Sequence, residues 1–99
     1  MEVILTDHFL ARVEECTDRI ALDHVPTALT WAEGVFEYCE QLRSHPESGR
    51  IVPEFGRPEI RELIHGNYRL AYELKVNQID MLTIWHTSQM LPDDPYQVG

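Results

Sequence analysis

The residues of this sequence best suited to chemistry are arginines and one histidine in its C-terminal half. Arg57 lies in a proline-rich segment, Arg61 and Arg69 flank a Gly-Asn turn, and His86 ends the last apolar segment. Guanidinium groups beside an imidazole can neutralise a phosphodiester and transfer a proton, as metal-free ribonucleolytic sites do. Arg61, Arg69 and His86 are therefore candidate catalytic residues. The alternative is a solvated sheet face on which each arginine pairs with a nearby glutamate, namely Glu59, Glu62 or Glu73.

Sequence patterns for other common chemistries are absent. The five histidines have no His-x-x-x-His spacing and the two cysteines no Cys-x-x-Cys spacing, so we predict no metal site and no cofactor. There is no glycine-rich phosphate loop, and no serine has the surroundings of a nucleophile elbow. Cys16 and Cys39 both fall on apolar faces of predicted helices. We expect them to be reduced core residues.

Length and composition indicate one globular domain. The chain has 99 residues, of which 43% are hydrophobic and 25% charged. We expect residues 1–91 to form a single domain and residues 92–99 to be a flexible tail. No apolar stretch approaches the ~20 residues that a membrane span needs, and the first residues lack the basic start of a signal peptide. We therefore expect a cytoplasmic protein without a membrane partner.

The charge is strongly acidic and unevenly distributed. The formal net charge is -9, from eight Lys and Arg against 17 Asp and Glu. The acids dominate residues 1–42, whereas bases and acids nearly balance over residues 43–75. Such a protein is repelled by phosphate backbones, which disfavours general affinity for nucleic acids. Any nucleic-acid contact is expected to come through residues 43–75.

Apolar periodicity predicts two helices in the first half of the chain. A short strand over residues 3–6 precedes a helix over about residues 8–23, with Asp7 as its N-cap. The second helix contains Pro26 in its first turn and extends to about residue 43. Its apolar stripe, which is expected to be core, comprises Val25, Ala28, Leu29, Ala32, Val35, Phe36, Cys39 and Leu42. The two helices form an antiparallel hairpin, in which Gly34 is expected to allow a close approach between them.

The second half of the chain predicts three strands after a structured, proline-containing loop over residues 44–58. The strands cover residues 60–64, 68–76 and 79–86, and short turns make them an antiparallel meander. The resulting α+β fold places the helical hairpin on one face of a four-stranded sheet. Alternation along the middle strand predicts that it is covered on one side only. The opposite face is expected to stay open, with Arg61, Arg69 and Lys75 exposed on it.

Three segments of this half resemble the ParE/RelE toxin superfamily of bacterial type II toxin–antitoxin systems. They are Arg57-Pro58-Glu59-Ile60-Arg61-Glu62-Leu63, Gly66-Asn67-Tyr68-Arg69-Leu70-Ala71-Tyr72 and the strand ending Ile84-Trp85-His86. The block Arg-Glu-Leu, two residues, Gly-Asn-Tyr-Arg, two residues, Tyr is distinctive of the ParE-like branch. The resemblance implies a RelE/ParE-like fold, which has the same strand, hairpin and meander.

The resemblance also implies a growth-inhibiting toxin that a cognate antitoxin neutralises, in a toxin–antitoxin hetero-oligomer. ParE-like members poison DNA gyrase, whereas RelE-like members cleave messenger RNA on the ribosome without a metal. Arg61 and Arg69 match the strand arginines of the family and His86 matches a histidine frequent at the end of the last strand. These positions also match in members without nuclease activity. The residues expected to bind a partner are Arg57, Tyr68, Tyr72 and Trp85.

The acidic charge departs from the commonly basic toxins of this superfamily, and it leaves three explanations open. They are a gyrase-type protein target, an antitoxin bound mainly through apolar contacts, and a catalytically inert toxin-fold protein. An open strand edge and a groove beside the helices would suit a helix or strand from a partner. The ribonuclease alternative requires Arg61, Arg69 and His86 to converge on one open face within ~6–8 Å. It fails if Arg69 pairs with a neighbouring glutamate and His86 is buried.

Overall fold

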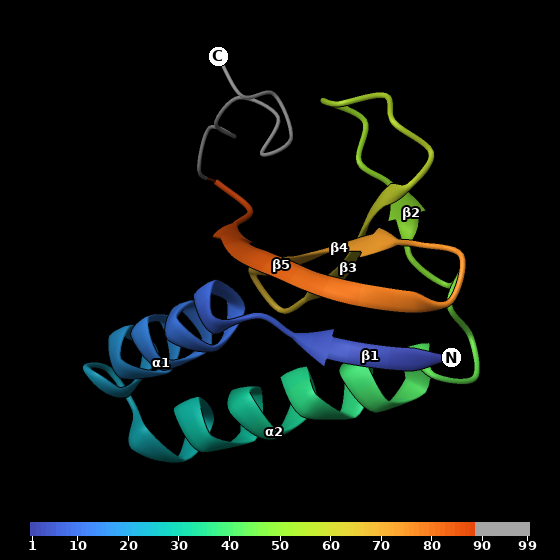
Figure 1. Cartoon of the computed structure of the whole chain (residues 1–99). Helices are drawn as coiled ribbons and strands as arrows, with labels where there is room; N and C mark the ends of the chain where they lie inside the picture. Colours follow the sequence, from blue (N-terminus) through green and yellow to red (C-terminus); the bar gives the residue numbers. More distant parts are fainter. Residues whose placement is uncertain (89–99) are drawn as a thin grey trace.

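The computed structural model describes residues 1–88, in which two helices lie against one face of a five-stranded sheet (Figure 1). The elements in chain order are β1 (Glu2–Leu5), α1 (Asp7–Ala21), α2 (Val25–Leu42), β2 (Arg50–Ile51), β3 (Ile60–His65), β4 (Tyr68–Leu74) and β5 (Gln78–His86). This order agrees with the predicted α+β fold. The predicted tail, residues 92–99, and the boundary at residue 91 lie outside the described residues.

The helices begin at capping side chains. The hydroxyl of Thr6 accepts a hydrogen bond of 3.1 Å from the backbone N–H of Phe9, so the predicted N-cap Asp7 is wrong by one residue. Asp7 instead lies in the first turn, where a negative charge is favoured by the helix dipole. The ring of His24 caps α2, and Pro26 occupies its first turn as predicted.

The sheet contains one more strand than predicted. Its order is β1-β5-β4-β3-β2, and β3, β4 and β5 form the predicted antiparallel meander. β1 pairs in parallel with the first half of β5, and β2 pairs antiparallel with β3 at the far edge. The prediction of four strands missed β2 because only Arg50 and Ile51 pair, which is too short for any alternation to be visible.

The main core lies between the helical hairpin and the sheet. Its buried residues are Phe9, Val13, Cys16, Trp31, Val35, Cys39, Leu42, Tyr68, Leu70, Tyr72, Ile79, Met81 and Ile84. Cys16 and Cys39 are free thiols and buried, as predicted. Val25, Leu29 and Phe36 are exposed, so the prediction that they belong to the core is wrong. They lie at one margin of an apolar stripe that is wider than the face α2 presents to α1 and the sheet.

The opposite face of the sheet is covered where it was expected to be open. The segment between β2 and β3 extends on the side of the sheet away from the helices (Figure 1). From it, the Phe55 ring packs edge-on against Trp85 of β5, with ring centroids 5.9 Å apart. The first five residues of β4, Tyr68–Tyr72, are consequently buried on both faces. The expectation that β4 is covered on one side only is therefore wrong.

Gly34 creates space for a side chain from the sheet and not for α1. A Cβ atom at this position would lie 2.5 Å from Cε1 and Nε2 of His65. The His65 ring stacks on Trp31, with centroids 5.7 Å apart, and its Nε2 lies 2.9 Å from the carbonyl oxygen of Trp31. The predicted role of Gly34 in the approach of the two helices is thus wrong. The close approach is between α2 and β3.

Candidate functional site

The strand pairing places Arg61 and Arg69 on opposite faces of the sheet. Arg61 on β3 pairs with Tyr72 on β4, and Tyr72 and Arg69 are three residues apart on the same strand. Because successive side chains of a strand alternate between faces, Arg61 shares the helix-facing side with Tyr72 while Arg69 points away. Arg61 Nη1 donates to the carbonyl oxygen of Gly49 at 3.0 Å. The two arginines therefore do not form the expected cluster.

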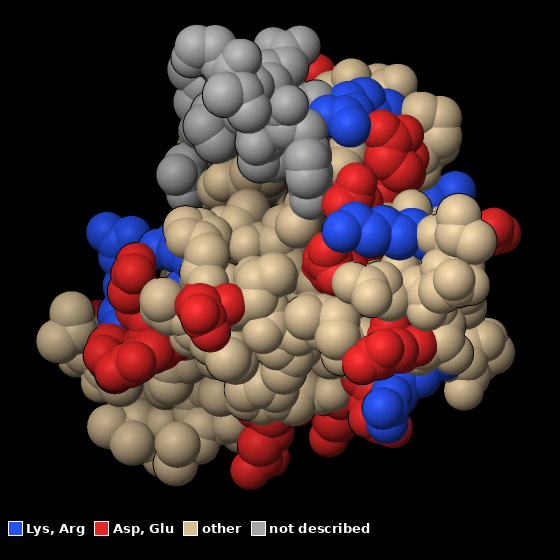
Figure 2. All heavy atoms as spheres, viewed as in Figure 1, with Lys and Arg blue, Asp and Glu red and all other residues tan. Residues whose placement is uncertain are grey.

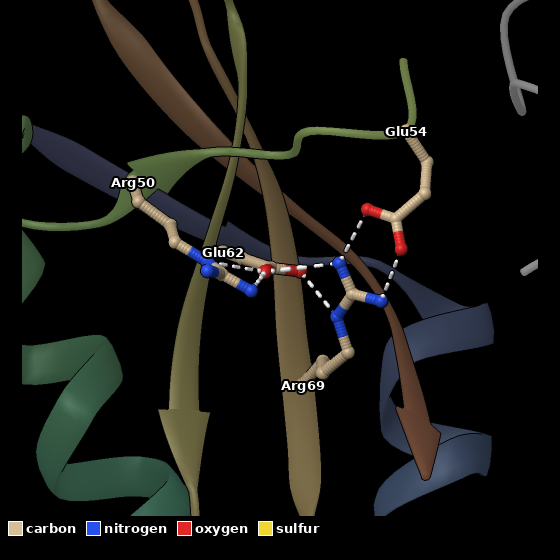
Figure 3. Close-up of polar contacts among 4 residues, drawn as sticks. All are labelled: Arg50, Glu54, Glu62 and Arg69. Carbon is tan, nitrogen blue, oxygen red and sulfur yellow. Dashed lines mark hydrogen bonds and ion pairs between the residues drawn. The ribbon is translucent and has the colours of Figure 1, made fainter. Parts of the chain in front are cut away.

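Arg69 is held between two glutamates from different segments (Figure 3). Its Nε donates to Glu62 Oε1 at 2.6 Å and its Nη2 to Glu62 Oε2 at 3.0 Å. Nη1 and Nη2 donate to the two carboxylate oxygens of Glu54, each at 2.8 Å. Arg50 Nε also donates to Glu62 Oε2, at 2.7 Å. We refer to Arg50, Glu54, Glu62 and Arg69 as the Arg69 network.

The Arg69 network fixes the charge of its members. The Glu62 side chain is 0% exposed and that of Arg69 is 8% exposed, so both charges depend on each other for compensation. The hydrogen bonds from Arg69 lower the pKa of Glu54 to about 2. The hydrogen bonds to Glu54, followed by those to Glu62, raise the pKa of Arg69. A guanidinium already shared by two carboxylates has little capacity left for a phosphate.

His86 lies on the helix-facing side of the sheet, away from Arg69. It pairs with Tyr68 across β4 and β5, and the two rings meet edge-on with centroids 5.1 Å apart. The backbone N–H of Ser88 donates to Nδ1 of the partly exposed His86 ring at 3.2 Å. His86 pairs with Tyr68, whereas Arg61 pairs with Tyr72. Tyr68 and Tyr72 lie four positions apart on β4, which is about 13 Å along the strand.

The three candidate catalytic residues therefore do not converge on one face. The alternative pairing with glutamates is found for Arg69 with Glu62 and for Arg57 with Glu59, the latter at 2.8 Å. A ribonuclease site was expected to require Arg61, Arg69 and His86 together on one open face. The structure does not meet this condition.

Basic side chains near His86 come from α1 and not from the strands. A surface hollow of 680 Å³ lies between the turn of the helical hairpin and the end of β5. It is lined by Arg19, Ile20, Asp23, His24, Thr27, Asn67, Tyr68, His86 and Ser88. A neighbouring hollow of 240 Å³ adds Arg12, whose Nε donates to the carbonyl oxygen of Ile84 at 3.0 Å. Sequence reasoning missed these two arginines, although their spacing of seven residues placed them on one face of the first helix.

The predicted partner-binding aromatic residues are part of the interior. Tyr68, Tyr72 and Trp85 are all buried. The Tyr72 hydroxyl donates to the carbonyl oxygen of Pro46 at 2.9 Å and accepts from the Gly49 N–H at 3.0 Å. Little of these three side chains is therefore accessible at the surface, and partner binding by them stays a prediction. Arg57 lies on the loop before β3 and is half-buried.

Within residues 1–88, no group of three or more His, Cys, Asp or Glu side chains is arranged to hold a metal ion. No helix in this range has both the length and the apolar character needed to cross a membrane.

The strand, helical hairpin and antiparallel meander define the fold of ParE-like toxins. The sequence matches the family described as "ParE toxin of type II toxin-antitoxin system, parDE" over residues 3–91. The chain belongs to this family and is the toxin component of a type II toxin–antitoxin system.

A solved structure agrees with this fold. The chain is similar to one in a structure titled "Chromosomal ParDE TA system from P. aeruginosa", with a TM-score of 0.73 and 20% sequence identity. The similarity covers 89% of this chain and 97% of the other. No curated protein matches the sequence.

Proposed function

We propose that this toxin inhibits growth by a ParE-like mechanism directed at DNA gyrase, and that a cognate antitoxin neutralises it in the cytoplasm. We favour gyrase over messenger RNA as the target because Arg61, Arg69 and His86 are distributed over two faces of the sheet. A protein target does not require these three groups to act on one substrate atom.

Two further features disfavour cleavage of messenger RNA on the ribosome. Arg69 could bind a phosphate only by releasing Glu54, which it holds through two hydrogen bonds of 2.8 Å. The net charge of -9 also opposes association with ribosomal RNA. Both features are compatible with a protein target.

The outer edge of β5 supports the proposal that a segment of the antitoxin binds there. β1 pairs with β5 only through Glu2–Leu5, opposite Gln78 to Met81. The rest of β5, from Leu82 to His86, extends beyond β1, and Arg12 reaches its edge at the carbonyl oxygen of Ile84. An extended antitoxin segment could continue the sheet there by displacing the Arg12 side chain.

The test is inducible expression of the chain in bacteria, with pulse labelling of DNA and protein synthesis. The variants are His86→Ala and the paired change Arg69→Met with Glu62→Leu, which removes both buried charges together and leaves neither unpaired. We expect DNA synthesis to stop first for the unmodified chain and for both variants. Purified chain is expected to inhibit supercoiling by gyrase in vitro.

Other outcomes separate the alternatives. Arrest in which translation stops first, relieved by His86→Ala, would support a ribonuclease. Absence of arrest at good soluble expression would contradict an active toxin and leave an inert interaction protein. Co-expression of the gene adjoining the toxin gene is expected to relieve the arrest and to yield a co-purifying complex, which tests the antitoxin.

A further inference from the structure

The solvent-facing side of α2 carries an apolar stripe. Val25, Leu29 and Phe36 are 55%, 58% and 44% exposed, respectively. Their separations of four and seven residues place the three side chains along one line of the helix. We refer to these three residues as the α2 stripe. Other exposed large apolar side chains include Leu22 at the end of α1, at 87% exposure, and Val76 in the β4–β5 turn, at 90%.

The charge along α2 next to the stripe is negative, and a base follows only at the end of the helix. α2 contains Glu33, Glu37 and Glu40 and neither Lys nor Arg, and its C-cap residue Arg43 pairs with Glu40 at 3.4 Å. At 3.6 residues per turn, Glu33 and Glu40 border the stripe on the side away from the core. In Figure 2, acidic side chains project from the lower edge of the molecule, where α2 lies in Figure 1, beside uncharged surface.

We propose that the α2 stripe binds a basic amphipathic helix of a partner protein. Apolar side chains of that helix, at spacings of three and four residues, would pack on Val25, Leu29 and Phe36. Its flanking Lys or Arg side chains would meet Glu33 and Glu40, the latter in exchange for its exposed ion pair with Arg43. This assigns a surface and the sign of a partner's charge, and it does not depend on gyrase being the target.

The same charges disfavour the other occupants of an exposed apolar stripe. A second copy of the chain would bring two sets of glutamates together across the contact, because each α2 carries three acids with the cap residue Arg43 as the one base at its end. A membrane surface with anionic headgroups would be repelled for the same reason. A basic segment gains from both the apolar and the acidic part of this face.

The experiment compares two synthetic helical peptides that share one leucine stripe, with leucines at spacings of three and four residues. The first has lysine at its flanking positions and the second has glutamate there. Binding of each peptide, fluorescently labelled, to the purified full chain is measured by anisotropy at several salt concentrations. We expect the lysine peptide to bind at least about tenfold more tightly, with an affinity that falls as salt rises.

Substitutions then place the binding on α2. The paired change Leu29→Ser with Phe36→Ser keeps the net charge and is expected to weaken binding of the lysine peptide at least about tenfold. Val76→Ser is the matched control, an exposed apolar residue outside the stripe, and is expected to leave binding unchanged. The change Glu33→Lys with Glu40→Lys should favour the glutamate peptide instead. All of these side chains are exposed, so the circular dichroism spectrum should stay that of the unmodified chain.

Three results would overturn the inference. The first is equal affinity for the two peptides. The second is binding of the lysine peptide that survives the Leu29→Ser and Phe36→Ser pair, because attraction to net charge alone would then explain it. The third is sedimentation of the unmodified chain as a dimer that the same pair dissociates, which would assign the stripe to a second copy. All three are measured on purified protein, independently of any effect on growth.

Discussion

Arg69 on β4 and Glu62 on β3 form an ion pair, with 2.6 Å between Nε and Oε1, in the covered face of the sheet. Glu62 pairs with Ala71 in the strand register, and Ala71 and Arg69 are two residues apart, so both charged side chains lie on the same face. Glu54 reaches Arg69 from the segment between β2 and β3. The pair therefore attaches this segment to the sheet, which is a structural role for a residue expected to be catalytic.

The first prediction concerns Arg69→Ala. The change leaves Glu62 completely buried with only Arg50 as its charged partner, and breaking a buried pair on one side costs about 3–5 kcal/mol. We expect the free energy of unfolding, measured by urea denaturation, to fall by about this amount. Arg57→Ala is the control, because its partly exposed pair with Glu59 is expected to change stability by less than about 1 kcal/mol.

This prediction changes how a growth experiment on Arg69 must be interpreted. Loss of toxicity in Arg69→Ala would follow from unfolding whether or not the guanidinium contacts a substrate. The paired change Arg69→Met with Glu62→Leu separates the two causes, since replacing both partners by apolar residues is often close to neutral. Equal destabilisation by Arg69→Ala and Arg57→Ala would contradict the structural role.

The second prediction is a pH dependence that arises from Glu54. Its folded pKa is lowered to about 2 from an ordinary value of 4.5, mainly by hydrogen bonds from Arg69. A lowered carboxyl pKa contributes stability that is present above about pH 4.5 and is lost as the pH falls towards about 2. Unfolding curves should therefore show Glu54→Gln as less stable than the unmodified chain at neutral pH, with the difference shrinking through this acidic range.

A matched change tests whether the effect is specific to the Arg69 network. Glu14→Gln, which removes an exposed carboxylate on α1 outside the Arg69 network, is the matched control. A constant difference for Glu54→Gln at all pH values would mean that Arg69 does not hold this carboxylate in solution.

Local patterns in the sequence were sufficient for the order and type of most elements. The helical hairpin follows from apolar spacing and from the break before Pro26, and the meander follows from short turns between apolar segments. What covers the far face of the sheet was not visible, because it depends on Glu54 and Phe55 folding back from a loop without periodicity. That contact is tertiary, and no local propensity encodes it.

The opposed positions of Arg61 and Arg69 could have been found from the sequence. A two-residue Gly-Asn turn pairs His65 with Tyr68, and counting back along both strands pairs Arg61 with Tyr72. Because Tyr72 and Arg69 are an odd number of residues apart, the two arginines must point to opposite faces. The prediction failed because it used the turn to infer proximity and did not extend the register to side-chain direction.

The third prediction is that the effect of Gly34→Ala on stability changes sign when the His65 side chain is removed. Gly34→Ala places a methyl group 2.5 Å from the His65 ring, which must leave its stack on Trp31. We expect the free energy of unfolding to decrease, although alanine in a helix is intrinsically favoured over glycine by about 1 kcal/mol. In a His65→Ala background the obstruction is gone, and Gly34→Ala should then stabilise the chain. Destabilisation in both backgrounds would show that His65 is not what restricts this position.

The fourth prediction concerns the two buried thiols. Burial raises the pKa of Cys39 to about 12, and it also raises that of Cys16, although the nearby Arg12 and Arg19 oppose the second shift. Since the thiolate is the reactive form, native Cys39 should react with iodoacetamide near neutral pH at least about a hundredfold more slowly than in denaturant.

Single-cysteine variants resolve the two positions. Cys16 lines the smaller hollow beside Arg12 and Arg19, so it should react faster in the native chain than Cys39 does. Cys16→Ala is therefore expected to slow native alkylation more than Cys39→Ala, with both thiols equally reactive in denaturant. Equal native reactivity of Cys39 and Cys16 would contradict this prediction, because Cys39 lies on the same buried face of α2 as Val35 and Leu42 in the main core.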